Sequence, residues 1–557
     1  MFKLSRRANV LRVLGILAVV VITITTVLVL KKQNQDNIEV NAISSANDPV
    51  YIDTFPESDG YISYGDYSTP RLKIANGDDY NDIITEVAFC TLPSRSRIPV
   101  NGRVKTTRPS GVSENDFLKM KLMIFIFLRG YYDNISNPAS VAAKTAGDMI
   151  FGIFSTNVSQ MSLDLKRAYT HAIISFIYDE SDARTYYTAT DPTSDILAKL
   201  SRAKNQLEYL INENDNAVAA ARNYKLFYVK GSESDNQQDV FWIESNPQYG
   251  KITVNKEDSA TGETPQGSAS FNGIKFTVFN ASGFTIYNES TGNYYPNNEA
   301  ITTKTLTGNN RTVTFDNLPA GPGIKYQVRE TATNASYQIN TEEIPPAELD
   351  EEGSNVNLLF KNDITKIDIE VNKYDSATHS STPQGNASFE GVRFELYLAE
   401  NQNPIRIGMM NIQPGNMITY KEISGSGNSV TFDNLPYAEY KIKEVIPGTG
   451  YEENDDTALV EPDDPIARFD NTPKYGKIVI NKVDSSTNSC TGAFEGTTFK
   501  IINDSENAIR YIKNGTPINI PGKHEGQQTD REIDTLTLGA GQCKAEISGL
   551  PYGSYII

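Results

Sequence analysis

The spacing of apolar residues divides the 557-residue chain into three stretches that predict different structures. Residues 13–30 form one continuous apolar run. Between residues 51 and 248, apolar positions recur at helical spacing in some segments and alternate with polar ones in others. Beyond residue 250, short alternating segments are separated by turn residues. This pattern predicts a leader, a mixed α and β unit, and a long β region.

The helical spacing predicts three helices within the mixed unit, residues 49–248. Ser113 opens a capping-box pattern before an apolar run that continues to residue 128 and is too short to span a bilayer. Two further helices are expected over residues 163–178 and 194–212. Strand-like segments precede and follow these helices, so the unit is expected to be an α+β domain.

Basic residues flank the first apolar run, and that arrangement is typical of an export signal. We expect residues 1–32 to be a signal peptide or a signal anchor, because the run length fits either, and residues 33–48 to be a linker. The protein should therefore be secreted and meet a membrane only through this segment. Acidic residues outnumber basic ones by 69 to 51, for a formal charge of −18, which argues against a nucleic-acid partner.

The β region contains an internal repeat with a period of about 110 residues, a length suited to an independent domain. Its first strand-like segment ends in Asn-Lys and begins near residues 250, 366 and 476. The sequence Thr-Pro-Gln-Gly marks the first two copies. The third copy stops before its closing strand, so the natural chain is expected to continue. We expect three β-sandwich domains, at residues 249–363, 364–473 and 474–557.

Each complete repeat places a lysine on its first strand, a glutamate late, and an asparagine on its last strand. These residues are Lys256, Glu330 and Asn362 in the first copy, Lys373, Glu444 and Asn471 in the second, and Lys482 alone in the third. Burial lowers the pKa of a lysine and raises that of a glutamate. A neutral amine beside a carboxamide could exchange amides with loss of ammonia. The alternative is an ordinary buried ion pair with a nearby turn asparagine.

The repeats resemble a known family in their Val-Asn-Lys start, their Leu-Pro turn, their Tyr-x-apolar-x-Glu strand and their terminal Phe-x-Asn. These features are similar to collagen-adhesin B-type (CnaB, SpaA-like, prealbumin-like) repeats of Gram-positive surface proteins and pilins. The resemblance covers residues 249–557 and implies tandem Ig-like or prealbumin-like β-sandwiches. It also implies intramolecular isopeptide bonds, Lys256 to Asn362 and Lys373 to Asn471, promoted by Glu330 and Glu444.

The chain has three cysteines, and an odd number in an exported protein leaves one outside any internal disulfide. Cys490 and Cys543 share the last domain and are candidates for a pair. Three interpretations of Cys90 remain. It is a buried structural cysteine, a protease-like nucleophile with His171 as base, or half of an internal thioester. No Cys-Gly-type protease signature is present.

The thioester interpretation rests on a second resemblance. Phe89-Cys90, followed much later by Gln238 before an apolar strand, resembles the thioester domains that cap Gram-positive adhesins and pili. Gln237 fits the same pattern nearly as well and stays an alternative. The resemblance implies a Cys–Gln thioester that reacts with an amine, with His171 as a candidate polar residue of the site.

Together these features predict a virulence-associated, cell-wall adhesin or pilus-tip protein. Its expected partners are amines of host surface or extracellular-matrix proteins, with other pilus subunits as further candidates. Attachment would be single-use, so we expect no enzyme, and neither a metal nor a cofactor is implied. The alternative is a structural, pilin-like spacer whose N-terminal domain binds its ligand non-covalently.

Overall fold

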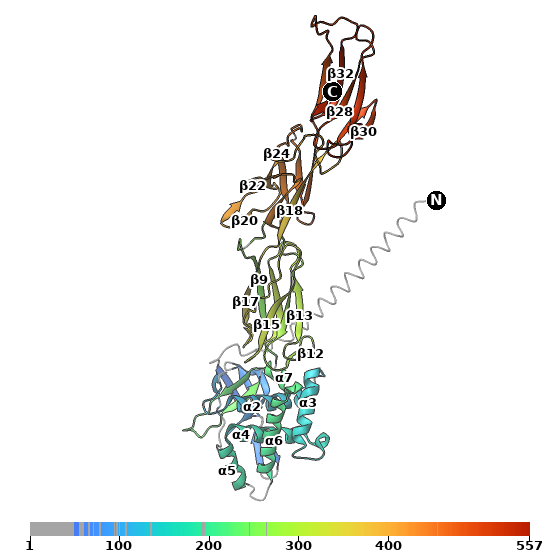
Figure 1. Cartoon of the computed structure of the whole chain (residues 1–557). Helices are drawn as coiled ribbons and strands as arrows, with labels where there is room; N and C mark the ends of the chain where they lie inside the picture. Colours follow the sequence, from blue (N-terminus) through green and yellow to red (C-terminus); the bar gives the residue numbers. More distant parts are fainter. Residues whose placement is uncertain are drawn as a thin grey trace, which may run out of the picture.

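The computed structural model describes residues 49–557 apart from gaps at residues 55–60, 65–66, 71, 77–78, 94, 96–98, 100, 106–107, 134–135, 191–194, 244–245, 263 and 454. The predicted leader and linker, residues 1–48, lie outside the described residues. In the described part, no helix is both long and apolar enough to cross a membrane. Figure 1 shows an elongated molecule, with an α+β unit at one end and three β domains arranged end to end.

A closed barrel of six short strands forms the β part of the N-terminal unit, with the strand order β1-β4-β5-β8-β7-β6. All of its pairs are antiparallel. The strands are β1 (Pro49–Thr54), β4 (Leu72–Asn76), β5 (Asp79–Cys90), β6 (Asn101–Lys105), β7 (Leu226–Val229) and β8 (Val240–Ile243). A separate hairpin joins β2 (Tyr61–Tyr64) to β3 (Tyr67–Pro70).

The helices are inserted between β6 and β7. They are α2 (Glu114–Phe127), α3 (Pro138–Phe151), α4 (Leu163–Tyr178), α5 (Glu180–Thr190), α6 (Ile196–Asn212) and α7 (Asn216–Arg222), with a π-helical turn at Leu128–Tyr132 and a 3-10 turn at Val158–Gln160. The three helices expected from the sequence are confirmed, and Ser113 caps α2 by accepting a hydrogen bond from the Asp116 amide. Helices α3, α5 and α7 were not predicted from the sequence.

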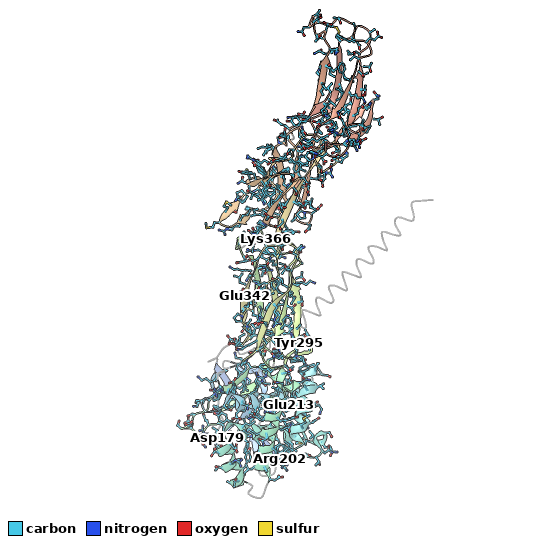
Figure 2. The ribbon with its side chains drawn as sticks, in the orientation of Figure 1. Asp179, Arg202, Glu213, Tyr295, Glu342 and Lys366 are labelled. Atoms are coloured by element: carbon cyan, nitrogen blue, oxygen red, sulfur yellow. A yellow bond between two sulfur atoms is a disulfide. The ribbon has the colours of Figure 1, made fainter. Side chains whose placement is uncertain are left out.

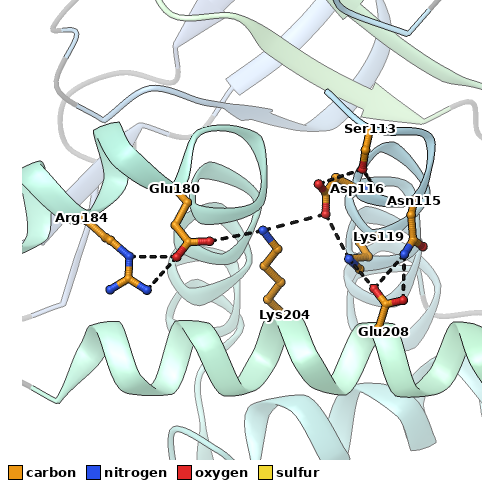
Figure 3. A network of polar contacts seen from close by, with 8 residues as sticks. All are labelled: Ser113, Asn115, Asp116, Lys119, Glu180, Arg184, Lys204 and Glu208. Atoms are coloured by element: carbon orange, nitrogen blue, oxygen red, sulfur yellow. Dashed lines mark hydrogen bonds and ion pairs between the residues drawn. The ribbon is translucent and has the colours of Figure 1, made fainter. Parts of the chain in front are cut away.

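A network of polar and charged side chains joins α2, α5 and α6 (Figure 3). The Lys119 amine on α2 lies 2.5 Å from a Glu208 carboxylate oxygen on α6. The Lys204 amine on α6 lies 3.4 Å from a Glu180 oxygen on α5. The Lys204–Glu180 pair is partly exposed, and ion pairs of that kind contribute little individually to stability.

Strand β5 lies between the apolar core of the helices and that of the barrel. Its successive side chains point alternately into one core and the other. Phe89 points toward the helices, and its ring meets that of Phe127 edge-on with centroids 5.6 Å apart. Cys90 instead belongs to the barrel interior with Val240 and Trp242. The last residues of β5 therefore connect the helical core to the barrel core.

Repeat 1 (residues 249–363) is a sandwich of the sheets β13-β10-β15-β16 and β14-β9-β17, with a small hairpin β11-β12. Its strands are β9 (Tyr249–Asp258), β10 (Lys275–Asn280), β11 (Ile286–Asn288), β12 (Asn293–Tyr295), β13 (Ala300–Thr305), β14 (Thr312–Pro319), β15 (Lys325–Ala332), β16 (Ala347–Glu348) and β17 (Asn355–Asn362). The last strand, β17, pairs in parallel with the first, β9.

Repeat 2 (residues 364–473) has the same plan, with the sheets β22-β19-β24-β25 and β23-β18-β26 and the hairpin β20-β21. Its strands are β18 (Lys366–Asp375), β19 (Arg393–Leu398), β20 (Ile405–Ile407), β21 (Met410–Ile412), β22 (Met417–Glu422), β23 (Ser429–Pro436), β24 (Tyr440–Ile446), β25 (Thr457–Val460) and β26 (Ile466–Asn471). Lys366, the first residue of β18, marks the junction with repeat 1 in Figure 2.

Repeat 3 (residues 474–557) contains the sheets β31-β28-β33 and β27-β32 and the hairpin β29-β30. Its strands are β27 (Tyr475–Asn481), β28 (Thr498–Asn503), β29 (Ile509–Lys513), β30 (Thr516–Ile520), β31 (Glu532–Thr537), β32 (Lys544–Pro551) and β33 (Tyr555–Ile556). A disulfide joins Cys490 to Cys543, with the two Cα atoms 5.7 Å apart. The sequence had left this pairing open.

Replacing both Cys490 and Cys543 by serine is expected to destabilise repeat 3 by about 4 kcal/mol, because the disulfide closes a loop with a sequence separation of 53 residues. The measurement is the urea dependence of proteolytic cleavage within residues 474–557 of the full chain. Cys90→Ser is the matched control and should leave that cleavage unchanged. Equal resistance of the double variant and the parent would contradict the expectation.

Candidate functional site

The lysine and asparagine of repeat 1 lie on the same buried face of two neighbouring strands. In the parallel pairing of β9 with β17, Lys256 is opposite Phe360 and Asp258 is opposite Asn362. Lys256 and Asn362 are therefore offset by two residues and share one side of the sheet. Each is only 1% exposed.

Glu330 reaches this pair from β15 in the facing sheet. The Asn362 carboxamide nitrogen donates a hydrogen bond of 2.6 Å to a Glu330 carboxylate oxygen. Burial lowers the pKa of Lys256 to about 8, and burial raises the pKa of Glu330. The lysine amine also lies 5.1 Å from the ring centre of Phe271 and 5.6 Å from that of Tyr337. This aromatic surrounding excludes water from the amine.

Repeat 2 reproduces the strand pairing, but its lysine contacts the glutamate, whereas the Lys256 amine donates to the Glu257 carbonyl at 3.1 Å. Lys373 is opposite Phe469 and Asp375 is opposite Asn471 in the parallel pairing of β18 with β26. The Lys373 amine lies 3.0 Å from a Glu444 oxygen, and both side chains are buried. The Asn471 amide donates to the other Glu444 oxygen at 2.5 Å. Burial lowers the pKa of Lys373, as it does in repeat 1.

Lys482 in repeat 3 has different surroundings. Its side chain is half-buried, and its amine lies 5.8 Å from the ring centre of Phe494. Among the described residues, the preceding strand β27 pairs only with β32. The lysine–aromatic contact is therefore common to all three repeats, whereas the enclosed lysine, glutamate and asparagine occur in the first two.

The second candidate site lies where β5 meets β8 in the barrel. Cys90 is opposite Val240, and the Thr91 amide donates to the Asp239 carbonyl at 2.9 Å. Gln238 lies two residues before β8, so continuing the strand's alternation backwards would place it on the side of Val240 and Cys90. Cys90 is 1% exposed and Gln238 is 7% exposed.

The two glutamines named by the sequence differ in their hydrogen bonds. The Gln238 amide donates to the Arg95 carbonyl at 2.9 Å, while its own carbonyl oxygen is buried and accepts no hydrogen bond within the described part of the chain. The side-chain oxygen of Gln237 accepts a hydrogen bond from the Ser232 backbone amide at 3.1 Å, and this side chain is less buried than that of Gln238. Gln238 is therefore the more buried of the two glutamines, whereas the Gln237 side chain forms its hydrogen bond within the loop before β8.

His171 on α4 contacts the cysteine directly. Its Nε2 atom lies 3.0 Å from the Cys90 sulfur. Burial lowers the pKa of His171 to about 4, so the imidazole is neutral at physiological pH. A neutral imidazole beside sulfur can accept a thiol proton or return one.

Three supporting residues were not found from the sequence. The Asp239 carboxylate accepts hydrogen bonds from the Gly231 amide at 2.8 Å and from the Tyr178 hydroxyl at 2.5 Å, which fixes the strand segment against α4. Arg95 supplies the carbonyl that binds Gln238. Leu92, with a φ of 57°, turns the chain so that the Arg95 amide donates to the Leu92 carbonyl at 2.9 Å. A left-handed leucine costs on the order of 1–3 kcal/mol, and such backbone strain clusters at functional sites.

The described residues contain no group of three histidine, cysteine, aspartate or glutamate side chains placed to hold a metal ion. The polar groups of the two candidate sites are a thiol, an imidazole, carboxamides, amines and carboxylates, which are groups that take part in acyl and amide chemistry.

Two segments of the chain, residues 250–364 and 367–468, match the SpaA family, described as a prealbumin-like fold domain. Repeats 1 and 2 are therefore prealbumin-like domains of the SpaA type, in agreement with their two-sheet architecture. No curated protein matches the chain.

Several solved structures show similarity at low sequence identity. The Bacillus anthracis TIE protein is 15% identical, with 92% of this chain and 94% of that chain covered and a TM-score of 0.33. A streptococcal ancillary pilin is 15% identical, covering 45% and 75%, with a TM-score of 0.18. The shaft pilin SpaA of Lactobacillus rhamnosus GG is 16% identical, covering 41% and 98%, with a TM-score of 0.17. At these values the similarities do not identify an activity.

The lowered pKa of His171 predicts acid sensitivity of the N-terminal unit. The folded unit binds fewer protons than the unfolded chain between the ordinary pKa of 6.5 and about 4, so stability should fall as the pH drops through that window. The full loss is on the order of 3 kcal/mol. His171→Gln should remove most of this dependence.

The measurement is urea unfolding at pH 7 and pH 4.5, followed by the fluorescence of Trp242. This residue is the single tryptophan of the chain and is buried in the barrel. The exposed His379 in repeat 2 supplies the control His379→Gln, which should leave the transition unchanged. Equal acid sensitivity of His171→Gln and the parent would show that His171 titrates normally.

Proposed function

We propose that this protein is a Gram-positive cell-surface adhesin that attaches covalently to amines through a thioester between Cys90 and Gln238. The observation that carries the proposal is the 3.0 Å contact of His171 with the Cys90 sulfur, on a strand whose partner is preceded two residues earlier by the buried Gln238. The SpaA-type domains would form its stalk, and secretion would follow from the predicted export signal.

Thioester formation needs no external reagent. The Cys90 sulfur attacks the Gln238 carboxamide carbon, a carbon–sulfur bond forms, and the carbon–nitrogen bond breaks. His171 accepts the thiol proton and passes it to the departing nitrogen, which leaves as ammonia. The Arg95 carbonyl already binds that nitrogen, so the leaving group is held away from the sulfur's approach. Apolar neighbours such as Trp242 would then protect the thioester from water.

In the attachment step, the Cys90 sulfur becomes the leaving group and an external amine becomes the nucleophile. A primary amine attacks the Gln238 carbonyl, a carbon–nitrogen bond forms, the carbon–sulfur bond breaks, and the Cys90 thiolate leaves. The proton lost by the amine returns to sulfur through His171. Each molecule reacts once, so the protein is a covalent ligand and not a catalyst with turnover. Candidate partners are amines of host surface or extracellular-matrix proteins.

The Cys90–His171 contact would also suit a cysteine hydrolase, with Cys90 as the nucleophile and His171 as the base. Such an enzyme must admit a substrate carbonyl to the sulfur. Here the sulfur faces the closed barrel and is 1% exposed, while the buried Gln238 lies just before the strand paired with β5. The geometry favours the internal acyl group. The remaining alternative is a pilin-like spacer with non-covalent binding, in which Cys90 is a structural residue.

We further propose that Lys256 and Lys373 form isopeptide bonds with Asn362 and Asn471. The neutral lysine amine attacks the asparagine carboxamide carbon, a new carbon–nitrogen bond forms and the old one breaks. A proton passes from the lysine nitrogen through the glutamate to the departing nitrogen, which leaves as ammonia. Glu330 or Glu444, when protonated, donates to the carboxamide oxygen after a half-turn of that group. Each bond closes a loop of roughly 100 residues, which by the chain-entropy argument stabilises its domain by about 4–5 kcal/mol. Association with other pilus subunits is a further proposal for this stalk.

The isopeptide proposal predicts the mass of the full chain. In a Cys90→Ala background, the folded protein should weigh two ammonia molecules less than its sequence. Glu330→Gln should remove one of these losses, because an amide cannot supply the proton, and should lower the stability of repeat 1 by the amount above. Peptide mapping should recover Lys256 joined to Asn362 in the parent only. Exposed Glu299 supplies the control Glu299→Gln, and an unreduced mass in the parent would reject the bonds.

The thioester proposal predicts one further ammonia lost in the wild-type chain, together with a thiol that does not react with maleimide. Incubation with methylamine should add one amine to Gln238 and restore one reactive thiol. Gln238→Ala and Cys90→Ala should abolish both changes, whereas Gln237→Ala should preserve them. A freely titratable Cys90 thiol in fresh, amine-free protein would remove the covalent mechanism and leave the spacer.

A further inference from the structure

The two junctions between consecutive repeats are built from the same residues. At the first, the side-chain oxygen of Gln266 accepts a hydrogen bond from the backbone amide of Arg406 on β20, at 2.9 Å. The Arg406 guanidinium donates back to the Ala260 carbonyl at 2.7 Å. At the second, Gln384 accepts from the Arg510 amide at 3.1 Å, and Arg510 donates to the Ala377 carbonyl at 2.6 Å.

Each of these glutamines is fixed within its own repeat by a buried aspartate. The Gln266 amide lies 3.1 Å from both oxygens of Asp258, which also accepts from the Tyr337 hydroxyl at 3.0 Å. In repeat 2, Asp375 accepts in the same way from Gln384 and from the Tyr451 hydroxyl at 2.9 Å. Since its nitrogen is engaged inside the repeat, the glutamine must present its oxygen to the next one.

The glycine that follows each glutamine permits close contact between the repeats. Gly267 has a φ of +56°, and a Cβ atom there would lie 2.5 Å from the Ala438 side chain of repeat 2. Gly385 has a φ of +63°, and its Cβ atom would lie 2.3 Å from the Tyr552 carbonyl of repeat 3. Both the backbone conformation and the space therefore require glycine.

The hairpin that receives the glutamine occurs in every repeat. In repeat 1 the equivalent hairpin, β11-β12, meets the N-terminal unit instead. There Glu289 accepts from the Tyr224 hydroxyl at 2.6 Å and from the Asn137 amide at 3.0 Å. Each repeat thus offers the same hairpin to the domain before it, with Tyr287 at the position that Arg406 and Arg510 hold in the later repeats.

We propose that Thr-Pro-Gln-Gly is an interdomain lock that recognises an arginine-bearing β-hairpin of the following repeat and holds successive repeats in one fixed orientation. The lock does not depend on the thioester or on the isopeptide bonds. In repeat 3 the loop after Asp484 contains no glutamine before Phe494, and Cys490 within it is bonded to Cys543. This end of repeat 3 therefore cannot receive a hairpin through the same contacts.

Distance measurements between spin labels in the full chain test the proposal. In a Cys90→Ala background, labels on cysteines replacing the exposed Thr302 and Thr419 report the first junction, and labels at Thr419 and Thr537 report the second. Each pair should give one narrow distance distribution. Gln266→Ala should at least double its width at the first junction and leave the second unchanged, and Gln384→Ala should do the reverse.

Variants on either side of the junction separate loss of the lock from loss of folding. Gly267→Ala in repeat 1 and Arg406→Ala in repeat 2 should both broaden the first distance, although they lie in different domains. The control is Gln327→Ala, since this glutamine donates to the Ile344 carbonyl within its own repeat at 2.8 Å. Unchanged widths in Gln266→Ala and Gly267→Ala, or equal broadening in Gln327→Ala, would overturn the proposal.

Discussion

Exclusion of water from a few polar side chains is the constraint on which both candidate sites depend. An ammonium group in an apolar core costs free energy unless it loses its proton or gains a partner. The cores of repeats 1 and 2 place such an amine beside a carboxylate and a carboxamide, between aromatic rings. Burial lowers the pKa of both lysines, which favours the neutral amine that the proposed amide exchange requires. The same packing prevents water from competing for the carbonyl carbon.

In the N-terminal barrel, water is excluded from a thiol, a carboxamide and an imidazole. Cys90 lies in the barrel interior, Gln238 is buried just before β8, and α4 adds an imidazole that burial keeps neutral. In the proposed mechanism this burial is needed, because water would hydrolyse a thioester on an exposed loop. The helical insertion would therefore matter to the chemistry as well as to packing, because it supplies His171 and also buries Phe89 and Phe241 on the other side of β5 and β8.

The sequence predicted several helices and strands, but it did not predict which side chains from distant segments come into contact. Strong amphipathic spacing identified α4, whereas α3 and α7 are rich in alanine and lack large apolar side chains at regular intervals. The choice between Gln237 and Gln238 depends on strand parity, because a shift by one residue moves a side chain to the other face. The contact of His171 with Cys90 depends on how α4 packs across β5, 81 residues away in sequence. Thr-Pro-Gln-Gly was visible only as a repeat marker, since its partners belong to the next domain.

The parallel pairing of β9 with β17 has a consequence for how the molecule transmits tension. The chain enters repeat 1 at the start of β9 and leaves it at the end of β17, so pulling loads the hydrogen bonds between these strands in shear. With Lys256 joined to Asn362, tension would pass up β9, cross the amide and continue into repeat 2. The roughly 100 residues between them would carry none of it. On the order of 350 Å of chain per repeat would then be unavailable for extension. Such a stalk would behave as a nearly inextensible tether.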